Sequence, residues 1–175
     1  MRKWTKWTTG LVFVAAFAVI VYVLVANLAG EENEPTAAVA TTLTLTDFAT
    51  KLPRTVDFAE MPTVLQVFTS WCPYCNEDAP KLVELQKKYE DQIHVIGINL
   101  YPRDTEEDLA AYLAKHDITY PVLLDEDGSL YEKLGKTGFP ALFFMDAKGE
   151  VASSRIGSID KRDMEEFLQL APLLR

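Results

Sequence analysis

The chain has 175 residues, 49% of them hydrophobic, and a formal net charge of −9. This length allows one domain, or one domain with an appendage. Only three of the 17 basic residues and none of the 26 acidic ones precede Glu31, so the remainder carries a net charge of −12. Such an acidic surface repels nucleic acid and anionic membrane surfaces, and we expect no nucleic-acid partner.

The N-terminal segment has the features of a membrane anchor. Residues 11–29 are apolar except for Asn27 and, as a helix, would span about 28 Å, close to the thickness of a bilayer core. Trp4 and Trp7 lie just before it, where indole rings favour lipid headgroups, and basic residues precede it. The positive-inside rule therefore predicts a cytoplasmic basic segment at 1–10, a single transmembrane helix in the lipid bilayer, and an extracytoplasmic remainder at the cell membrane.

A cleavable signal peptide is the competing interpretation of this segment. Its apolar region usually has about 7–15 residues and ends in a small-x-small cleavage site. Here the run is longer, and cleavage after Ala29 would place Asn27 where a small residue is needed. We favour an uncleaved anchor, followed by a linker at 30–41 and a globular domain at 42–175. Both interpretations export the domain.

The globular domain alternates predicted strands and helices. The strands are predicted at 63–69, 93–100, 122–124, 141–145 and 151–156, and the helices at 75–90, 105–116, 129–134 and 161–170. Pro80 is expected to kink the first helix. Thr105 and Asp160 have the side chains and positions of helix N-caps. No element is predicted between Thr42 and Pro62.

This order of elements predicts an α/β fold. Strand, helix, strand and helix, followed by a hairpin and a last helix, indicate a mixed sheet with helices on both faces. The first crossover should be parallel and right-handed. In such sheets the functional site lies at the carboxyl ends of the strands. The motif Trp71-Cys72-Pro73-Tyr74-Cys75 directly follows the strand at 63–69, so we expect the chemistry there.

Cys72 and Cys75 are the only cysteines and form one C-x-x-C pair. At the start of a helix, residues three apart lie on one face, close enough for a disulfide. The helix N-terminus favours the thiolate of Cys72, which is the nucleophile in disulfide exchange. Cys75, one turn further, would resolve the mixed disulfide. Pro73 stiffens the first turn, where its missing N–H is not needed.

Two other uses of the cysteine pair are weaker. A structural disulfide over so short a loop removes little entropy from the unfolded chain. A zinc site needs about four ligands, and the two histidines, His94 and His116, have no ligand spacing to each other. We therefore expect redox chemistry at Cys72 and Cys75, without a metal ion or other cofactor.

Several segments resemble the thioredoxin superfamily, and most closely its membrane-anchored TlpA/ResA-like branch. They are F-T-S-W-C-P-Y-C at 68–75, D-A-P at 78–80, Y-P-V-L-L-D at 120–125 and T-G-F-P-A-L-F-F-M-D-A-K-G-E-V at 137–151. The resemblance runs from about Val64 to the C-terminus. It implies a thioredoxin-like fold and thiol–disulfide oxidoreductase activity.

The resemblance also assigns roles near the dithiol. Pro140 aligns with the family's cis-proline, which faces the dithiol, although a trans proline opening an edge strand is the plain alternative. Phe139 is larger than the residue that the family often has before this proline. We expect Phe139 and Tyr74 to line the substrate groove. Trp71 is expected beside the dithiol, as a docking surface or as ordinary core.

Several polar residues near the motif have either a functional or a purely structural role. Asp78 aligns with a family glutamate thought to assist proton transfer to and from the thiols, but acids are common in first helical turns for dipole reasons alone. Gln66 stands where thioredoxins carry a buried aspartate, and it cannot accept a proton as a carboxylate does. Asn99, Tyr101 and Arg103 either rim the groove or are plain loop residues.

The favoured function is a reductase of disulfides in exported proteins, with apocytochrome c as one substrate the resemblance suggests and a membrane thiol carrier as electron donor. An oxidase or isomerase of folding proteins would differ only in reduction potential.

Glutaredoxins share the C-P-Y-C sequence but not the anchor or the insertion at 100–137. A peroxidase of the peroxiredoxin type would need the pattern Pro-x-x-x-Thr/Ser-x-x-Cys; Thr69 lies three residues before Cys72, but the position of the proline is taken by Leu65. Copper-carrying relatives use C-x-x-x-C, one residue longer.

Overall fold

The computed structural model describes residues 41–135 and 138–173. The predicted cytoplasmic segment, transmembrane anchor and nearly all of the linker lie outside these residues. Within them, no helix has the length and apolarity that a membrane crossing needs.

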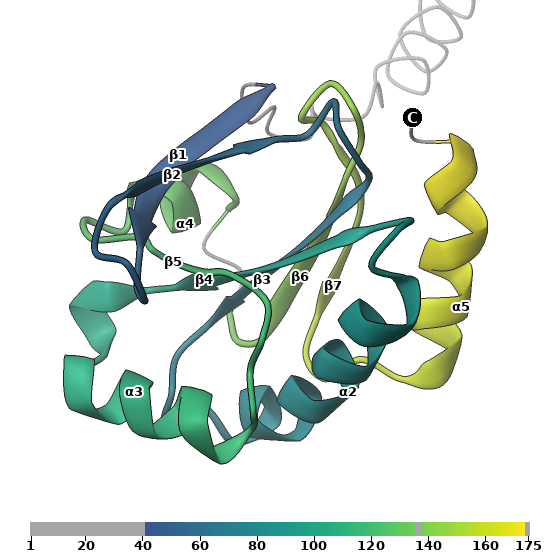
Figure 1. Ribbon diagram of the computed structural model, residues 1–175. Coiled ribbons are helices and arrows are strands. Elements are labelled where there is room, and N and C mark those ends of the chain that lie inside the picture. The colour runs from purple at the N-terminus through teal and green to yellow at the C-terminus, as the bar shows by residue number, and fades with distance from the viewer. Residues whose placement is uncertain (1–40, 136–137, 174–175) are drawn as a thin grey trace, which may run out of the picture. The chain divides into compact units, whose positions relative to one another are not determined.

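The described part is built on one mixed sheet of seven strands (Figure 1). The strands are β1 (Thr42–Asp47), β2 (Pro53–Asp57), β3 (Thr63–Phe68), β4 (His94–Asn99), β5 (Val122–Leu124), β6 (Ala141–Met145) and β7 (Val151–Ile156). Their order across the sheet is β2-β1-β5-β4-β3-β6-β7. β3, β4 and β5 pair in parallel, and the other pairs are antiparallel. The predicted mixed sheet is confirmed.

Helices cover both faces of the sheet. They are α2 (Pro73–Tyr89), α3 (Glu106–Lys115), α4 (Ser129–Lys133) and α5 (Lys161–Leu170), with 3-10 turns at Tyr101–Arg103 and Ala171–Leu173. Buried side chains of α2, α3 and α5 join one apolar cluster, and those of α4 join another. The helices therefore divide three to one between the two faces, as Figure 1 shows.

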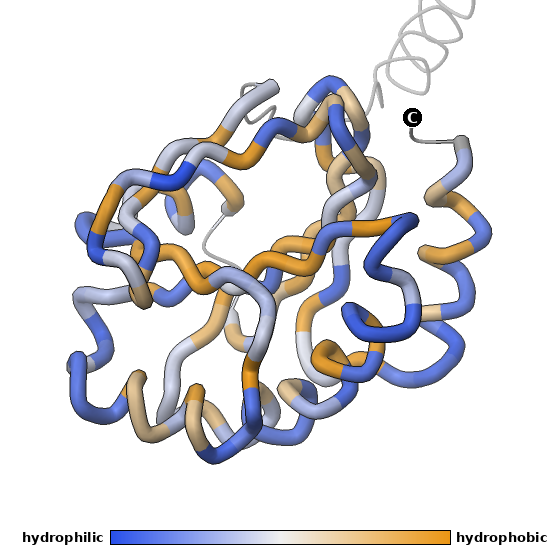
Figure 2. Tube along the Cα trace, in the orientation of Figure 1, coloured by the Kyte–Doolittle hydropathy of each residue, from blue (hydrophilic) through white to orange (hydrophobic). Residues whose placement is uncertain are grey.

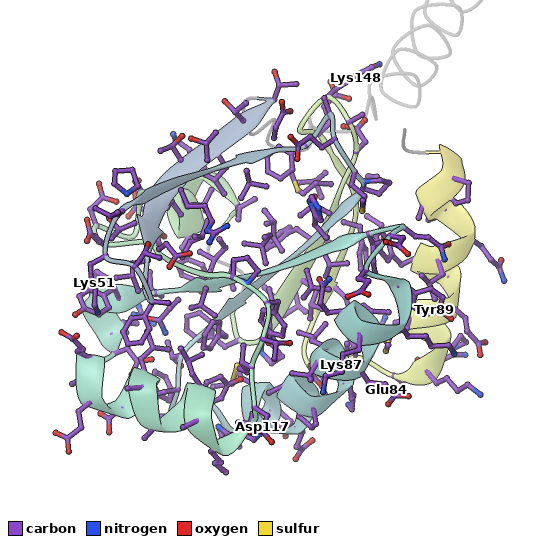
Figure 3. The ribbon with its side chains drawn as sticks, viewed as in Figure 1. Lys51, Glu84, Lys87, Tyr89, Asp117 and Lys148 are labelled. Carbon is purple, nitrogen blue, oxygen red and sulfur yellow. A yellow bond between two sulfur atoms is a disulfide. The ribbon has the colours of Figure 1, made fainter. Side chains whose placement is uncertain are left out.

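The inner strand β3 explains why the core has two halves. All six of its residues are buried. Since side chains alternate along a strand, Val64 and Phe68 enter the cluster beneath α2, while Leu65 and Val67 enter the one beneath α4. The buried strands β3, β4, β5 and β6 form the mainly orange centre of Figure 2. The exposed residues Glu84 and Lys87 lie on α2, as Figure 3 shows.

The predicted elements from β3 onward are confirmed to within two residues at each end. Thr105 and Asp160 are N-caps, each accepting a hydrogen bond from a backbone N–H three residues on. α2 starts two residues earlier than predicted and continues through Pro80. The unpredicted elements are the two 3-10 turns and the strands β1 and β2, which form a hairpin at the edge of the sheet.

Candidate active site

The cysteine pair lies where β3 gives way to α2, at the carboxyl end of the strand, as predicted. Cys72 and Cys75 form a disulfide with their Cα atoms 5.2 Å apart. Cys72 is 4% exposed and Cys75 is fully buried. Of the two, only Cys72 keeps any exposed surface, so the structure gives the two cysteines unequal access.

Cys72 is also the N-cap of α2. Its Sγ accepts a hydrogen bond from the backbone N–H of Cys75 at 3.2 Å, and Pro73 occupies the first helical turn. No acidic side chain lies in that turn. The N–H groups and the dipole of the helix stabilise negative charge at this position, which favours the thiolate of Cys72 once the disulfide is reduced.

Asp104 holds the loop that leads into the motif. Its carboxylate accepts hydrogen bonds from the backbone N–H of Ser70 at 2.6 Å and from the Ser70 hydroxyl at 2.5 Å. It also accepts one from Nδ2 of Asn99 at 2.8 Å. Asn99 is the fully buried last residue of β4, so it is neither a groove rim nor a plain loop residue. Asp104 thus joins the ends of β3 and β4 just before Cys72.

Asn76 fixes the first turn of α2 from the side of α3. Its Nδ2 donates to the carbonyl oxygens of Ser70 and Cys72, each at 2.9 Å. These two bonds orient the amide, so its Oδ1 accepts from Lys115 Nζ and from His116 Nε2, both at 2.9 Å. Because Oδ1 cannot donate, Nε2 of His116 must carry a proton. Burial and then the Lys115 cation lower the pKa of His116.

Tyr112 supports the second cysteine. Its hydroxyl donates to the carbonyl oxygen of Cys75 at 2.9 Å, and its ring stacks on Phe68 at 5.1 Å. Burial, followed by the negative charges of Asp78 and Asp104, raises the pKa of Tyr112 far above its ordinary value. Tyr112 therefore remains a neutral hydrogen-bond donor at any working pH.

The aromatic residues and the cis-proline predicted around the dithiol lie together. The Phe139–Pro140 peptide bond is cis, as the resemblance implied. Trp71 is 59% exposed and meets the Phe139 ring edge to face at 6.2 Å. Its Nε1 donates to the carbonyl oxygen of Arg103 at 2.7 Å. Trp71 is thus a surface residue held in place, and Tyr74, 57% exposed, is the other exposed ring of the motif.

Asp78 is fully buried and occupied by partners from another part of the chain. Its carboxylate accepts from Lys81 Nζ at 2.8 Å, from the Ser158 hydroxyl, and from the backbone N–H of Ile159 at 3.1 Å. Lys81 Nζ donates further to the Ile159 carbonyl oxygen at 2.7 Å. The observed role of Asp78 is to tie α2 to the segment before α5. Its role in proton transfer stays a hypothesis.

The chain is similar in sequence to known thiol–disulfide oxidoreductases. Residues 36–154 match the model of the AhpC/TSA family. The chain belongs to the AhpC/TSA family. It is 27% identical over 142 residues to the thiol-disulfide oxidoreductase ResA of Bacillus cereus, covering 79% of this chain and 80% of that protein. It is 28% identical over 108 residues to the thioredoxin-like protein YneN of Bacillus subtilis, covering 61% of this chain and 63% of YneN, less than two thirds.

The fold is also that of a solved relative. The crystal structure of StoA from Bacillus subtilis superposes with a TM-score of 0.65 at 21% identity, covering 75% of this chain and 98% of StoA. A likeness at this identity establishes the thioredoxin-like fold. Together with the family match and the Cys72–Cys75 disulfide, it makes the described domain a thiol–disulfide oxidoreductase domain of the ResA type.

Within the AhpC/TSA family, this chain carries its chemistry on a C-x-x-C pair. The proline that a peroxidatic motif needs is replaced by Leu65, a fully buried residue in the middle of β3. Thr69 is buried as well, and its hydroxyl has no hydrogen-bond partner in the structure. Gln66 is fully buried with both amide atoms unpartnered. In the described ranges, no group of three or more His, Cys, Asp and Glu side chains is placed to hold a metal ion.

Sequence reasoning missed three residues of this site. Asp104, Asn76 and Tyr112 all bind the backbone of residues 70–75, yet none belongs to a recognised motif. A weak signal exists for Asn76, because an amide directly after the second cysteine can cap the carbonyl groups of a tight turn. Asp104 and Tyr112 gave no local signal, since Ser70 and Cys75, which they bind, lie more than 30 residues away in the sequence.

Proposed function

We propose that the protein is a membrane-anchored, extracytoplasmic reductase that opens disulfides in exported proteins. The observation that carries this proposal is the unequal access to the two sulfurs, because a dithiol reductase needs one attacking and one resolving cysteine. The ResA relatives, named as thiol-disulfide oxidoreductases, support the same chemistry. The anchor at 11–29 supports the location.

The reaction would proceed in two exchanges. The Cys72 thiolate attacks one sulfur of a substrate disulfide, a bond forms between Cys72 and the substrate, and the other substrate sulfur leaves as a thiolate. Cys75 then loses its proton and attacks Cys72, which releases the second substrate thiolate. Two electrons pass to the substrate, both substrate sulfurs take up protons, and the Cys72–Cys75 disulfide remains.

A reductase must then be reduced again. We propose that a membrane-bound dithiol carrier donates two electrons to the Cys72–Cys75 disulfide by the same exchange in reverse. Apocytochrome c is the substrate that the sequence resemblance suggests, since its haem-binding cysteines must be reduced. Oxidase or isomerase activity would use the same residues, and a measured reduction potential decides the direction.

The mechanism is tested by replacing each cysteine in the full-length chain. Cys72→Ser should reduce insulin at the uncatalysed rate, a loss of about a thousandfold or more, because a hydroxyl does not replace a thiolate nucleophile. Cys75→Ser should keep the attack but accumulate mixed disulfides, which non-reducing gels and mass spectrometry detect. The double variant is the blank. Insulin reduction by Cys72→Ser at the wild-type rate would contradict the proposal.

A further inference from the structure

Asn76 connects a cation on α3 to the backbone of the redox turn. Its Nδ2 donates to the carbonyl oxygens of Ser70 and Cys72, each at 2.9 Å. Its Oδ1 accepts from Lys115 Nζ and from His116 Nε2, both at 2.9 Å. An amide side chain can donate two hydrogen bonds and accept two, so Asn76 uses its full capacity here. The side chain therefore has one orientation, with its oxygen toward α3 and its nitrogen toward the redox turn.

Lys115 is the charged member of the pair on α3. Burial and then the Lys115 cation lower the pKa of His116, so the imidazole ring is neutral at about pH 7. Lys115 is the basic residue in the last turn of α3, where the helix dipole favours a positive charge. The dipole and the oxygen of Asn76 both stabilise the ammonium group in this position. The fold thus fixes where the positive charge lies, although the side chain of Lys115 is exposed.

Asp104 places a negative charge on the other side of the same turn. Its carboxylate accepts from the backbone N–H and from the hydroxyl of Ser70. Every group that donates to it, among the described residues, is a neutral amide, backbone or hydroxyl group. Ser70 therefore has a carboxylate at its N–H and, through Asn76, the Lys115 cation at its carbonyl oxygen.

A thiolate at Cys72 is affected by both charges. Cys72 is only 4% exposed, and burial opposes the ionisation of a thiol. The carboxylate of Asp104 opposes it further, whereas the N-terminus of α2 favours it. A cation bound to the Asn76 amide polarises that amide and the Cys72 carbonyl group, and solvent screens charges less along these part-buried bonds than at the surface. The Lys115 cation therefore adds to the interactions that favour the thiolate.

Resting on the proposed function, we propose that Lys115, bound through Asn76, stabilises the Cys72 thiolate that attacks the substrate and offsets the charge of Asp104. Lys115 and Asn76 are positioning residues in this role, because they act through the Cys72 carbonyl group and not on its sulfur. They lie outside the C-x-x-C motif and on different helices. The reactivity of the motif is therefore set in part by α3.

The first test measures the ionisation of Cys72 in the full-length Cys75→Ser chain, where it is the only thiol. Lys115→Gln removes the charge and keeps a donor for Asn76. The midpoint of the thiolate absorbance titration should rise by about 0.5 pH units. At a pH below that midpoint, alkylation by iodoacetamide should slow about twofold, because the loss of thiolate is partly offset by its higher nucleophilicity.

Two further variants show whether the charge itself is responsible. Lys115→Arg keeps the positive charge and should restore the wild-type midpoint and alkylation rate. Lys87→Gln removes an exposed lysine about 22 Å along α2 from Cys72, beyond the reach of an unscreened charge, and should change neither value. A midpoint in Lys115→Gln equal to that of Lys87→Gln overturns the proposal.

The connection through Asn76 is tested in the same chain. Asn76→Ala should raise the midpoint by at least as much as Lys115→Gln. Adding Lys115→Gln to Asn76→Ala should raise it further by less than about 0.2 pH units, because the two residues act as one unit. Fully additive shifts overturn the connection. If Asn76→Ala does not fold, Lys115→Gln and Lys115→Arg still decide the proposal.

The outcomes separate this inference from the function on which it rests. An unchanged midpoint in Lys115→Gln, with Cys72-dependent insulin reduction by the wild type intact, overturns the role of Lys115 and leaves the function standing. Failure of the wild type to reduce insulin overturns the function, whereas the titration of the single thiol still decides what Lys115 does.

Discussion

Asp78 and Asp104 hold the dithiol helix from two different directions. Asp78 lies inside α2 and binds Lys81, Ser158 and Ile159, so it fastens the helix to the segment before α5. Asp104 lies outside the helix and binds Ser70 and Asn99, so it fastens the loop that delivers Cys72. The first carboxylate is placed to act on stability and the second on the reacting sulfur. Proximity to a motif in the sequence is thus a poor guide to which acid serves it.

The largest effect on stability is expected at Asp78. Asp78→Ala leaves the Lys81 cation and two further donors without their acceptor, so the free energy of unfolding should fall by about 3 kcal/mol. Denaturant titration measures this change. The adjacent exposed Glu77, changed to Ala, is the control and should stay within about 0.5 kcal/mol of the wild type.

Asp78→Asn brings the proton-transfer hypothesis into the same comparison. The amide keeps the shape of the carboxylate and removes its ability to take up a proton. We expect the absorbance titration of the Cys72 thiolate to stay within about 0.3 pH units of the wild-type curve, which corresponds to about 0.4 kcal/mol. A larger displacement would show that Asp78 serves the thiols as well as the helix.

A smaller change in stability and a larger one in reactivity are expected at Asp104. Asp104→Asn removes the negative charge that binds Ser70, two residues before Cys72, which should lower the pKa of the Cys72 thiol. The loosened Ser70 loop should cost about tenfold in the rate of insulin reduction, as misplacement of a reacting group does. Thiolate absorbance against pH and an insulin assay measure the two effects. Asp91→Asn, an exposed acid after α2, is the control; equal changes in both variants would refute the role of Asp104.

The smallest effect is expected at His116, which binds the same turn through Asn76. Its pKa is lowered in the folded protein by burial and by Lys115, so the neutral ring stabilises the fold above the unfolded pKa of about 6.5. This stabilisation is lost as the pH falls below that value. Between pH 7 and pH 5, the free energy of unfolding should therefore fall less in His116→Gln than in the wild type. His94→Gln is the matched control, and an identical pH profile for both variants would exclude the coupling.

The sequence predicted those parts of the fold whose signals are local. β3 was identified by its run of apolar and β-branched residues, and α5 by the N-cap Asp160. The hairpin of β1 and β2 was missed because most of its residues are polar and few of them are buried, and β1 joins the sheet through only two residue pairs with the distant β5. α2 continues through Pro80, which lies in the helix interior and cannot donate a backbone hydrogen bond there, and the expected kink at Pro80 stays a prediction.

The residues of the site also divide into those that the sequence predicted and those that it did not. Cys72 and Cys75 were predictable because their spacing and helix position carry the chemistry themselves. Pro140 was predictable only through family resemblance, and the cis bond confirms it. Asp104 and Tyr112 were not predictable, because they act on residues that the fold, and not the sequence, brings next to them.

The bond from Asp104 to Ser70 has a consequence for protein engineering. A segment such as Trp71–Cys75 looks like a cassette that could be exchanged between relatives to change their redox behaviour. Here the backbone of that segment and its flanks is held by Asp104 in the loop before α3, by Tyr112 in α3 and by Asn76 in α2 itself. A transplant that carries the five motif residues alone would leave these anchors behind. A successful graft has to move Asp104, Tyr112 and Asn76 together with the cysteines.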